Sequence, residues 1–261
     1  MADPFEHPVF IIGCARSGTS ILGELVGQHP EVAYMFEASW AWEAGGRGEN
    51  GSDRLTEAHV TPEVAWLVRQ RLEKRLTTGS VLVEKNPRTS LRVPFVRALF
   101  PDARFVHIIR DGRDVACSLV PGCGGDEWRH LKPPSWQELR VDYSGVRRTA
   151  RVWRDVLEIA LADLETAPHM TIRYEDLIAD PRREAERVLG FLELGPTAEV
   201  ERFYKRIGNV VDPRYEAAGQ VKWGRRGHGV RIGRWRELEA DDQRDMNAIL
   251  RPMLARLGYA A

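Results

Sequence analysis

The chain has 261 residues, of which 43% are hydrophobic and 29% are charged, so it is long enough to bury the core of one large α/β domain and requires no second one. Its 38 basic and 38 acidic residues cancel, which argues against nucleic acid or an anionic membrane as a partner. Its cysteines, Cys14, Cys117 and Cys123, are odd in number and lack metal-ligand spacing, so we expect reduced thiols in a cytoplasmic protein without a metal site.

Apolar runs in the sequence predict the strands of a parallel sheet. The runs cover residues 9–12, 32–36, 80–83, 104–109 and 170–174. Helices with both ends predicted cover residues 20–28, 111–119, 143–164, 197–207 and 239–257. Two more helices are predicted to begin at Thr61-Pro62 and at Asp180-Pro181, and one runs from the end of the third run to Phe100. Strands that alternate with helices predict the α/β class, as a P-loop-like three-layer sandwich with a central parallel sheet flanked by helices.

A single domain is predicted to span residues 1–261, with some segments outside the regular pattern. Residues 44–60 form a polar loop with several glycines, and residues 121–136, rich in glycine, proline and tryptophan, form an insertion over the site. Residues 222–236 form a basic, glycine-rich loop. We therefore expect substrate or lid segments near residues 38–60, 121–142 and 208–236.

The first strand leads into the sequence Gly13-Cys14-Ala15-Arg16-Ser17-Gly18-Thr19-Ser20, which predicts an anion-binding loop. The glycines have the spacing of a nucleoside-triphosphate P-loop, but Thr19 stands where the Walker lysine is required. The backbone N–H groups of residues 17–20, at a helix N-terminus, would bind a phosphate together with the Arg16 side chain. The sequence thus predicts a phosphate site that does not take an Mg-nucleoside triphosphate; the alternative is a strand–turn–helix with incidental glycines.

Charged or polar residues follow several of the predicted strands at the point where each strand ends. They are Arg16, Glu84-Lys85, Arg110 and Tyr174. Ligands of open parallel sheets bind beyond the carboxyl ends of the strands. We expect these side chains to line one binding site at that edge of the sheet.

Two further motifs accompany the loop: Val83-Glu84-Lys85-Asn86-Pro87, and the segment FVHIIRDGRDVACS from Phe105 to Ser118. With these motifs in this order, the sequence resembles the sulfotransferases that use 3′-phosphoadenosine 5′-phosphosulfate (PAPS), in particular the branch of the tyrosylprotein sulfotransferases and many bacterial relatives. The resemblance runs from the first loop through Tyr174 and, more weakly, to Trp235. It implies an enzyme that releases 3′-phosphoadenosine 5′-phosphate (PAP).

The resemblance also implies which residues bind the donor. Those for the 5′-phosphosulfate are Arg16, Ser17, Gly18, Thr19 and Ser20. Arg110 and Ser118 would grip the 3′-phosphate, and Tyr174 would lie near the cofactor. Arg234, in the sequence RIGRW, would close over the 3′-phosphate, although this basic loop could instead be solvated or touch nucleic acid. Two further alternatives stay open: Arg110 could be a surface arginine paired with Asp111 or Asp114, and Tyr174 could serve packing alone.

The transfer itself requires cations and a base around the moving sulfonate. We expect Lys85 and Arg16 to stabilise the charge, although Lys85 could be a surface lysine paired with Glu84. Glu37 is predicted as the general base by resemblance, because the family branch with an arginine in its first loop places a glutamate after a His-Pro and a short strand. The other candidate bases are Glu43, Glu84 and His107, of which His107 lies in an apolar strand and is expected to be a core residue.

The acceptor is the part of the reaction that the sequence specifies least. Residues 1–7 resemble no signal peptide and no apolar run approaches about 18 residues, so neither membrane association nor export is expected. We expect a bacterial enzyme that sulfates a hydroxyl of a small molecule, such as a natural product, a glycolipid or a sugar. The tryptophans at 40, 42, 128 and 136 would form an apolar wall for it or belong to the core. The alternative functions are a P-loop small-molecule kinase and an inactive nucleotide-binding module.

Overall fold

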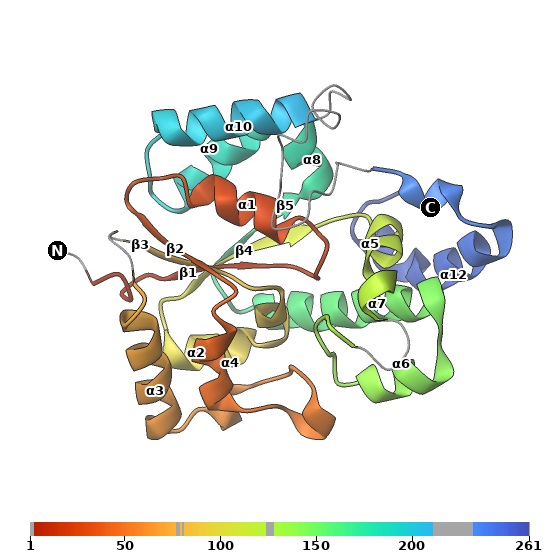
Figure 1. Ribbon diagram of the computed structural model, residues 1–261, viewed down its shortest axis with the longest axis horizontal. Coiled ribbons are helices and arrows are strands. Elements are labelled where there is room, and N and C mark those ends of the chain that lie inside the picture. The colour runs from red at the N-terminus through yellow and green to blue at the C-terminus, as the bar shows by residue number, and fades with distance from the viewer. Residues whose placement is uncertain (1–2, 77–78, 80, 124–127, 211–231, 261) are drawn as a thin grey trace.

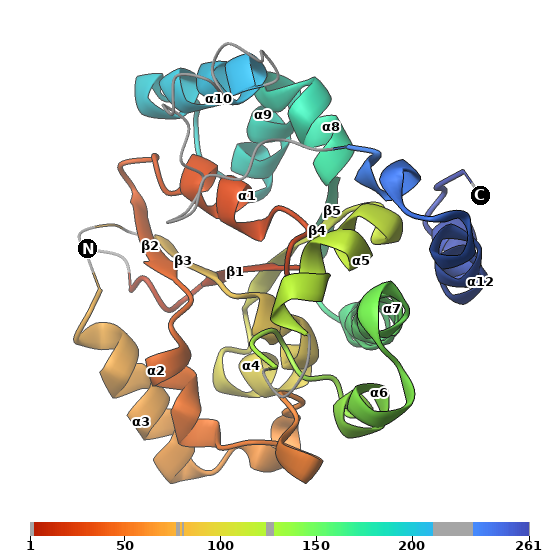
Figure 2. The ribbon, with the colours of Figure 1, turned by 45° about the vertical axis from the view of Figure 1, so that its right-hand side comes forward.

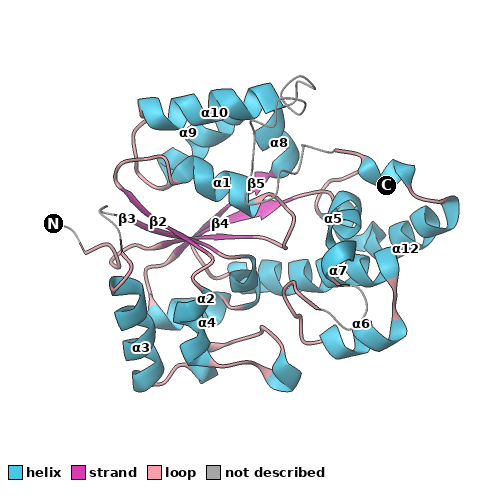
Figure 3. Cartoon of the chain, in the orientation of Figure 1, coloured by secondary structure: helices cyan, strands magenta, loops and turns pink. Residues whose placement is uncertain are grey.

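A five-stranded parallel sheet forms the middle of the molecule, with the strand order β2-β3-β1-β4-β5 (Figure 1, Figure 3). The computed structural model describes residues 3–76, 79, 81–123, 128–210 and 232–260. Every adjacent pair of strands is parallel, so the carboxyl ends of the strands lie at one edge of the sheet. The strands are β1 (Val9–Ile12), β2 (Val32–Phe36), β3 (Val81–Lys85), β4 (Arg104–Ile109) and β5 (His169–Arg173).

Helices cover both faces of the sheet, as Figure 1 and Figure 2 show, so the predicted three-layer sandwich is confirmed. On one face lie α1 (Thr19–Val26), α8 (Tyr174–Ala179), α9 (Pro181–Phe191) and α10 (Ala198–Val210). On the other lie α2 (Ser39–Trp42), α3 (Pro62–Glu73) and α4 (Val93–Leu99). A further group, packed around its own apolar core, contains α5 (Gly112–Leu119), α6 (Trp136–Asp142), α7 (Gly145–Leu164) and α12 (Ala240–Arg256).

The central strand β1 is buried on both faces because its side chains alternate in direction. Val9 and Ile11 pack in the apolar cluster that contains α1, whereas Phe10 and Ile12 pack in the opposite cluster with Phe95. Burying a side chain of this size contributes about 1.5–3 kcal/mol. The strand is therefore a rigid support for the loop that follows it.

Helix α5 begins at Gly112, where the backbone passes close to the ring of Trp153 in α7. A β-carbon at Gly112 would lie 2.7 Å from ring atoms of Trp153, which is fully buried, so a larger residue would push α5 away from α7. This contact fixes the start of α5. It thereby fixes the spacing between Arg110, just before the helix, and Ser118 near its end.

Two of the predicted element boundaries are wrong. The strand predicted over 170–174 ends at Arg173, and Tyr174 begins α8 instead. The helix predicted up to Phe100 is divided into a 3-10 turn, Pro87–Leu91, and α4, because Pro87 and Pro94 each begin a separate turn. The division leaves the chain after Lys85 free to turn across the carboxyl edge of the sheet.

The predicted loops are only partly surface segments. The loop over 44–60 buries Ser52, Asp53 and Leu55, although its composition is polar. Most of the predicted lid over 208–236, and residues 124–127 of the predicted insertion, lie outside the described residues. None of the described helices is long and apolar enough to span a membrane. The extent of the domain, 1–261, stays a prediction.

Candidate active site

Residues 13–18 connect β1 to α1 and form the loop predicted to bind an anion. The backbone is left-handed at Arg16, with a φ of 73°, and at Gly18, with a φ of 101°. The Ser17 side chain is fully buried, and its Oγ has no hydrogen-bond partner among the residues that the structure describes. Left-handed backbone at a non-glycine residue and an unpartnered buried hydroxyl are both typical of a loop that holds a ligand.

Gly18 is the position at which this loop requires glycine. A β-carbon there would lie 2.5 Å from Cδ2 of Tyr174, so the tyrosine ring packs directly on the loop backbone. The guanidinium carbon of Arg110 lies 4.4 Å from the centre of the same ring. The structure therefore brings three predicted donor residues, Gly18, Arg110 and Tyr174, into one cluster.

The two arginines of the predicted site are joined to each other. Arg16 Nε donates to Ser118 Oγ at 2.9 Å, and Arg110 Nη1 donates to the carbonyl oxygen of Arg16 at 3.2 Å. Burial lowers the pKa of Arg16, and the neighbouring charge of Arg110 lowers it further. Two adjacent guanidinium groups at this edge of the sheet attract an anion with several charges.

Two acidic residues at the start of α5 pair with different arginines. Arg110 Nη2 lies 3.7 Å from Asp114 Oδ2, whereas Asp111 pairs with Arg113 at 2.8 Å. Asp114 Oδ2 also accepts the backbone N–H of Gly233 at 2.8 Å. Arg110 is therefore held between α5 and the loop and is not a surface arginine, since the whole residue is 8% exposed.

Arg234 lies in the 3-10 turn Arg234–Glu237, which follows Gly233 at a φ of 85°. Burial raises the pKa of Cys117 to about 11, Asp114 adds to the rise, and Arg234 opposes it. The charge of Arg234 thus acts on the residue next to Ser118, at the predicted 3′-phosphate site. Arg231, from the same motif, lies outside the described residues.

Lys85 is a buried lysine whose ammonium contacts the predicted base. Its Nζ lies 2.7 Å from Glu37 Oε1 and 3.1 Å from Ser20 Oγ, and 3.6 Å from the centre of the Phe36 ring. Burial lowers the pKa of Lys85, and the charge of Glu37 raises it. The alternative of a surface lysine paired with Glu84 is wrong, because Lys85 is inaccessible to solvent and pairs with Glu37.

Glu37 has a left-handed backbone conformation, with a φ of 45°, directly after β2. Two backbone N–H groups tie this turn to β3: that of Glu37 donates to the Lys85 carbonyl at 2.8 Å, and that of Ala38 donates to Glu84 Oε1 at 3.1 Å. Glu84 Oε1 also accepts from Trp42 Nε1 at 3.1 Å. Because β3 fixes the turn, the Glu37 carboxylate is held at Lys85.

The other candidate bases are placed differently. Glu84 is fully buried and faces away from Lys85, since successive strand residues point to opposite faces of the sheet. His107 is fully buried in β4, and burial lowers its pKa to about 4, so it is the core residue that was expected. Glu43 is exposed. Of the four candidates, Glu37 is the one that contacts Lys85, and its role as base stays a prediction.

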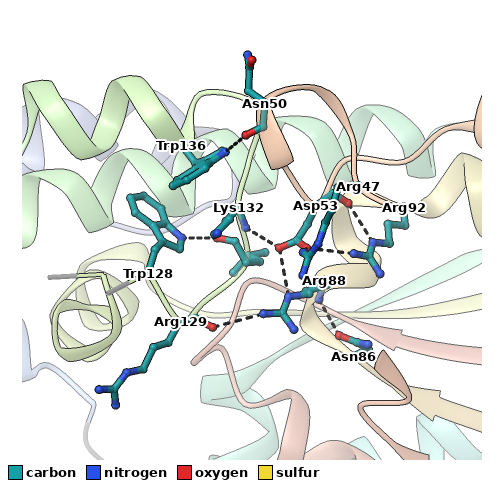
Figure 4. Close-up of polar contacts among 11 residues, drawn as sticks. Arg47, Asn50, Asp53, Asn86, Arg88, Arg92, Trp128, Arg129, Lys132 and Trp136 are labelled. Atoms are coloured by element: carbon teal, nitrogen blue, oxygen red, sulfur yellow. Dashed lines mark hydrogen bonds and ion pairs between the residues drawn. The ribbon is translucent and has the colours of Figure 1, made fainter. Parts of the chain in front are cut away.

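Some residues that complete the site carry no sequence signal. Ser90 Oγ accepts the N–H of Gly13 at 2.8 Å and so holds the start of the loop. Asp53 is fully buried among three arginines, of which Arg88 and Arg92 lie far away in the chain (Figure 4). Ser90 and Asp53 both have distant partners of this kind, so no local pattern distinguishes them. Conversely, Trp42 belongs to the core, with an edge contact to Phe10, and cannot form part of an acceptor wall.

Comparisons with known proteins agree with this geometry. A family model described as the sulfotransferase family matches residues 8–198. Protein-tyrosine sulfotransferase 1 of Danio rerio is 28% identical over 273 residues, a match that covers 96% of this chain and 72% of that protein. The range that the family model covers spans the loop, Glu37, Lys85 and the segment from Arg110 to Ser118.

Solved structures share the fold. The sulfotransferase domain from the curacin biosynthetic pathway has a TM-score of 0.58 at 14% identity, and the match covers 100% of this chain and 99% of that one. The mouse sulfotransferase SULT7A1, solved with PAP, has a TM-score of 0.55 at 14% identity, and the match covers 97% of this chain and 85% of that one. At these identities the likeness concerns the fold.

The contact between Gly18 and Tyr174 makes Gly18→Ala a sharp test of the loop. The new methyl group would meet the ring at a backbone φ that alanine rarely adopts, so we expect a loss of about 1–3 kcal/mol of unfolding free energy. We also expect PAP affinity to fall about tenfold or more. Urea unfolding and calorimetric titration measure the two effects.

Gly190→Ala is the matched control, because a β-carbon at Gly190 in α9 would have no described atom within 4 Å. It should raise the unfolding free energy by about 0.5–1 kcal/mol and leave PAP affinity unchanged. Equal PAP affinity in Gly18→Ala and the wild type would show that the loop does not bind the nucleotide.

The buried carboxyl of Glu84 predicts a particular pH dependence of stability. Burial raises its pKa from 4.5 to about 7, so the folded state binds this proton more tightly than the unfolded state. The stabilisation is complete below the ordinary pKa and is lost as the pH rises through about 7. Glu84→Gln has no charge to bury, so its stability relative to the wild type should increase with pH. The difference in unfolding free energy between the variant and the wild type should be about 1–3 kcal/mol larger at about pH 8 than at about pH 5.

Urea unfolding at the two pH values measures this difference. Glu63→Gln, at an exposed position in α3, serves as the control and should keep the pH dependence of the wild type. The same dependence in Glu84→Gln and the wild type would contradict the desolvation of Glu84.

Proposed function

Since this chain belongs to the family of sulfotransferases that use PAPS, we propose that it transfers the sulfonate of PAPS to a hydroxyl of a small-molecule acceptor, with Glu37 as the general base. The observation that carries this proposal is the contact between the buried ammonium of Lys85 and the partly exposed carboxylate of Glu37. It provides a cation and a proton acceptor beside the anion loop. A kinase would require a lysine in place of Thr19.

The donor half of the proposed site consists of the loop and the residues that contact it. Arg16 and the backbone of residues 17–20 would hold the 5′-phosphosulfate, where the buried hydroxyl of Ser17 is available as a donor. Arg110, Ser118 and Arg234 would hold the 3′-phosphate. Arg16 reaches both halves of the donor site because it already contacts Ser118.

In the proposed reaction the acceptor oxygen attacks the sulfur in line with the leaving phosphate oxygen. The new oxygen–sulfur bond forms while the bond from sulfur to the phosphate oxygen breaks, and the acceptor proton passes to Glu37. Lys85 and Arg16 stabilise the negative charge that is spread over the sulfonate and the leaving oxygen. The Glu37 side chain is 41% exposed, so an acceptor can approach it from solvent, whereas the Lys85 side chain is buried behind it.

Two observations bear on the acceptor and its surroundings. Trp128 and Trp136 make an edge contact with ring centroids 5.7 Å apart, and this aromatic surface supports a flat or sugar-like small molecule. The free, buried cysteines support a reducing, cytoplasmic compartment. The name of the zebrafish relative supports a second candidate acceptor, the hydroxyl of a tyrosine in a protein.

Nucleotide titration tests the donor assignment. We expect the protein to bind PAP and to show no heat with ATP, and we expect Arg110→Ala to weaken PAP binding about tenfold or more by removing a charge-assisted contact. Arg182→Ala is a matched control, because Arg182 also forms an (i, i+4) pair but lies exposed on α9. Equal PAP affinity in Arg110→Ala and Arg182→Ala would contradict the role of Arg110.

Turnover measurements test the chemistry. An acceptor screen with PAPS, read by the mass gain of a sulfonate, should find small-molecule hydroxyls, and sulfation of tyrosine peptides alone would contradict the small-molecule proposal. With the acceptor found, Glu37→Gln should lower turnover about 10²–10⁴-fold, since it removes the proton acceptor. Lys85→Ala should lower it about 10²–10³-fold.

Glu43→Gln is the control for the base, because Glu43 is exposed and close in sequence. It should keep the wild-type turnover. Turnover of folded Glu37→Gln within a few-fold of the wild type would show that another group takes the proton.

A further inference from the structure

Asp53 is a buried carboxylate at the centre of a polar network on one side of the site (Figure 4). It accepts hydrogen bonds from the side chains of Arg47, of Arg88 at 3.2 Å and of Arg92 at 3.0 Å. Three guanidinium groups around one carboxylate leave an excess of positive charge. The carboxylate therefore holds the network together, because without it the arginines would repel one another.

The network joins three segments that are distant in the sequence. Asp53 Oδ2 accepts the backbone N–H of Lys132 at 2.8 Å, and the Asp53 N–H donates to the Lys132 carbonyl at 2.8 Å. Arg88 Nη2 donates to the Arg129 carbonyl at 3.4 Å. Residues 129–132 are thus fixed at both ends, by Arg88 and by Asp53.

The Arg88 end of the network lies close to the proposed reaction centre. Arg88 follows Lys85 by three residues, and the turn between them is fixed because Asn86 Oδ1 accepts the Arg88 N–H at 3.0 Å. The Asn86 N–H in turn donates to the carbonyl of Ile11 in β1 at 3.2 Å. A rigid connection therefore leads from the end of β3 to the segment 129–132.

Two side chains lie between the anchors of this segment: Leu131 is buried in the apolar core, and His130 is the polar one. Its ring packs against Gly122, where a β-carbon would lie 2.1 Å from Nε2. Burial lowers the pKa of His130 to about 4, Arg16 and Arg88 lower it further, and Glu37 opposes the fall. The imidazole is thus uncharged at neutral pH, and one of its nitrogens can donate a hydrogen bond to a hydroxyl while the other accepts one.

We propose that Asp53 is a positioning residue for the acceptor half of the site, and that it holds residues 129–132 so that His130 contacts the acceptor hydroxyl beside Glu37. This inference rests on the proposed function. The donor half is separate from it, because the contacts of Gly18, Ser118 and Tyr174 do not include the Asp53 network.

Asp53→Asn is the first test, because it keeps the size of the side chain and removes the charge. We expect KM for the acceptor found in the screen to rise about tenfold or more, with the affinity for PAP unchanged within about twofold. A mere loss of stability would not separate the two affinities in this way.

Asp163→Asn is the matched control. Asp163 lies on α7 and pairs with Arg54, the neighbour of Asp53, with one contact at 2.9 Å, so its loss also removes an anchor of the same loop. It should leave both KM for the acceptor and PAP affinity unchanged. If Asp53→Asn does not fold, Arg88→Gln takes its place, with the same expected rise in KM.

His130→Ala tests the second half of the proposal. It should raise KM for the acceptor as Asp53→Asn does. KM of the double variant should not exceed that of the single variant with the higher KM, because both changes remove the same contact between His130 and the acceptor. If the rises in KM caused by the two single changes multiply in the double variant, Asp53 does not act through His130. An unchanged acceptor KM in Asp53→Asn, or a loss of PAP affinity of about tenfold, would overturn the positioning role.

Hydrogen exchange in the PAP complex gives a readout that does not depend on turnover. Asp53→Asn should speed amide exchange in residues 129–137 and leave residues 13–20 unchanged, whereas Asp163→Asn should leave both unchanged. If no acceptor is sulfated but PAP binds and this exchange pattern appears, the transferase proposal fails, whereas the result that Asp53 holds residues 129–132 in place is retained. Unchanged exchange in residues 129–137 overturns the positioning role whatever the acceptor.

Discussion

A buried ammonium group imposes the main constraint on this structure. Lys85 ends β3 without access to solvent, and an unpaired charge in such a place would cost several kcal/mol. Glu37 compensates it at 2.7 Å, which requires the left-handed turn after β2. Glu84, buried on the other face of β3, holds that turn through the N–H of Ala38. The two neighbouring strand ends and their ion pair therefore form one unit, and a change in any part displaces the proposed base.

The remaining cations of the site explain why a neutral chain would bind a highly charged donor. The sequence has 38 basic and 38 acidic residues, so the attraction must come from local placement. Arg110 donates to the Arg16 carbonyl, and the charge of Arg110 lowers the pKa of Arg16. An anion that binds between them relieves this repulsion only in the folded state. Donor binding should therefore stabilise the loop as well as occupy it.

The sequence predicts the strand ends and the turn of the proposed donor site because these signals are local. An apolar strand, a glycine-containing turn and the start of a helix are adjacent in the chain, and Lys85 and Arg110 directly follow or end strands. Tertiary contacts decide the features that the sequence does not predict. Tyr174 begins a helix and packs on Gly18. Trp42 lies in the core, where its indole N–H donates a hydrogen bond to Glu84. No pattern of neighbouring residues records such contacts.

The acceptor side has a different kind of architecture, and this difference limits what a sequence or a shared fold can say about it. Its segments lie outside the sheet and are joined by side chains, with Asp53 bound to residues 35 to 79 positions away. The parallel sheet fixes the donor loop in any chain of this fold, whereas the segment 129–132 keeps its position only while its own polar partners are present. Structures that match the fold at 14% identity can therefore share the donor edge and differ in the acceptor segment. In the proposed site, the position of the acceptor segment therefore depends on contacts such as those of Asp53 and Arg88.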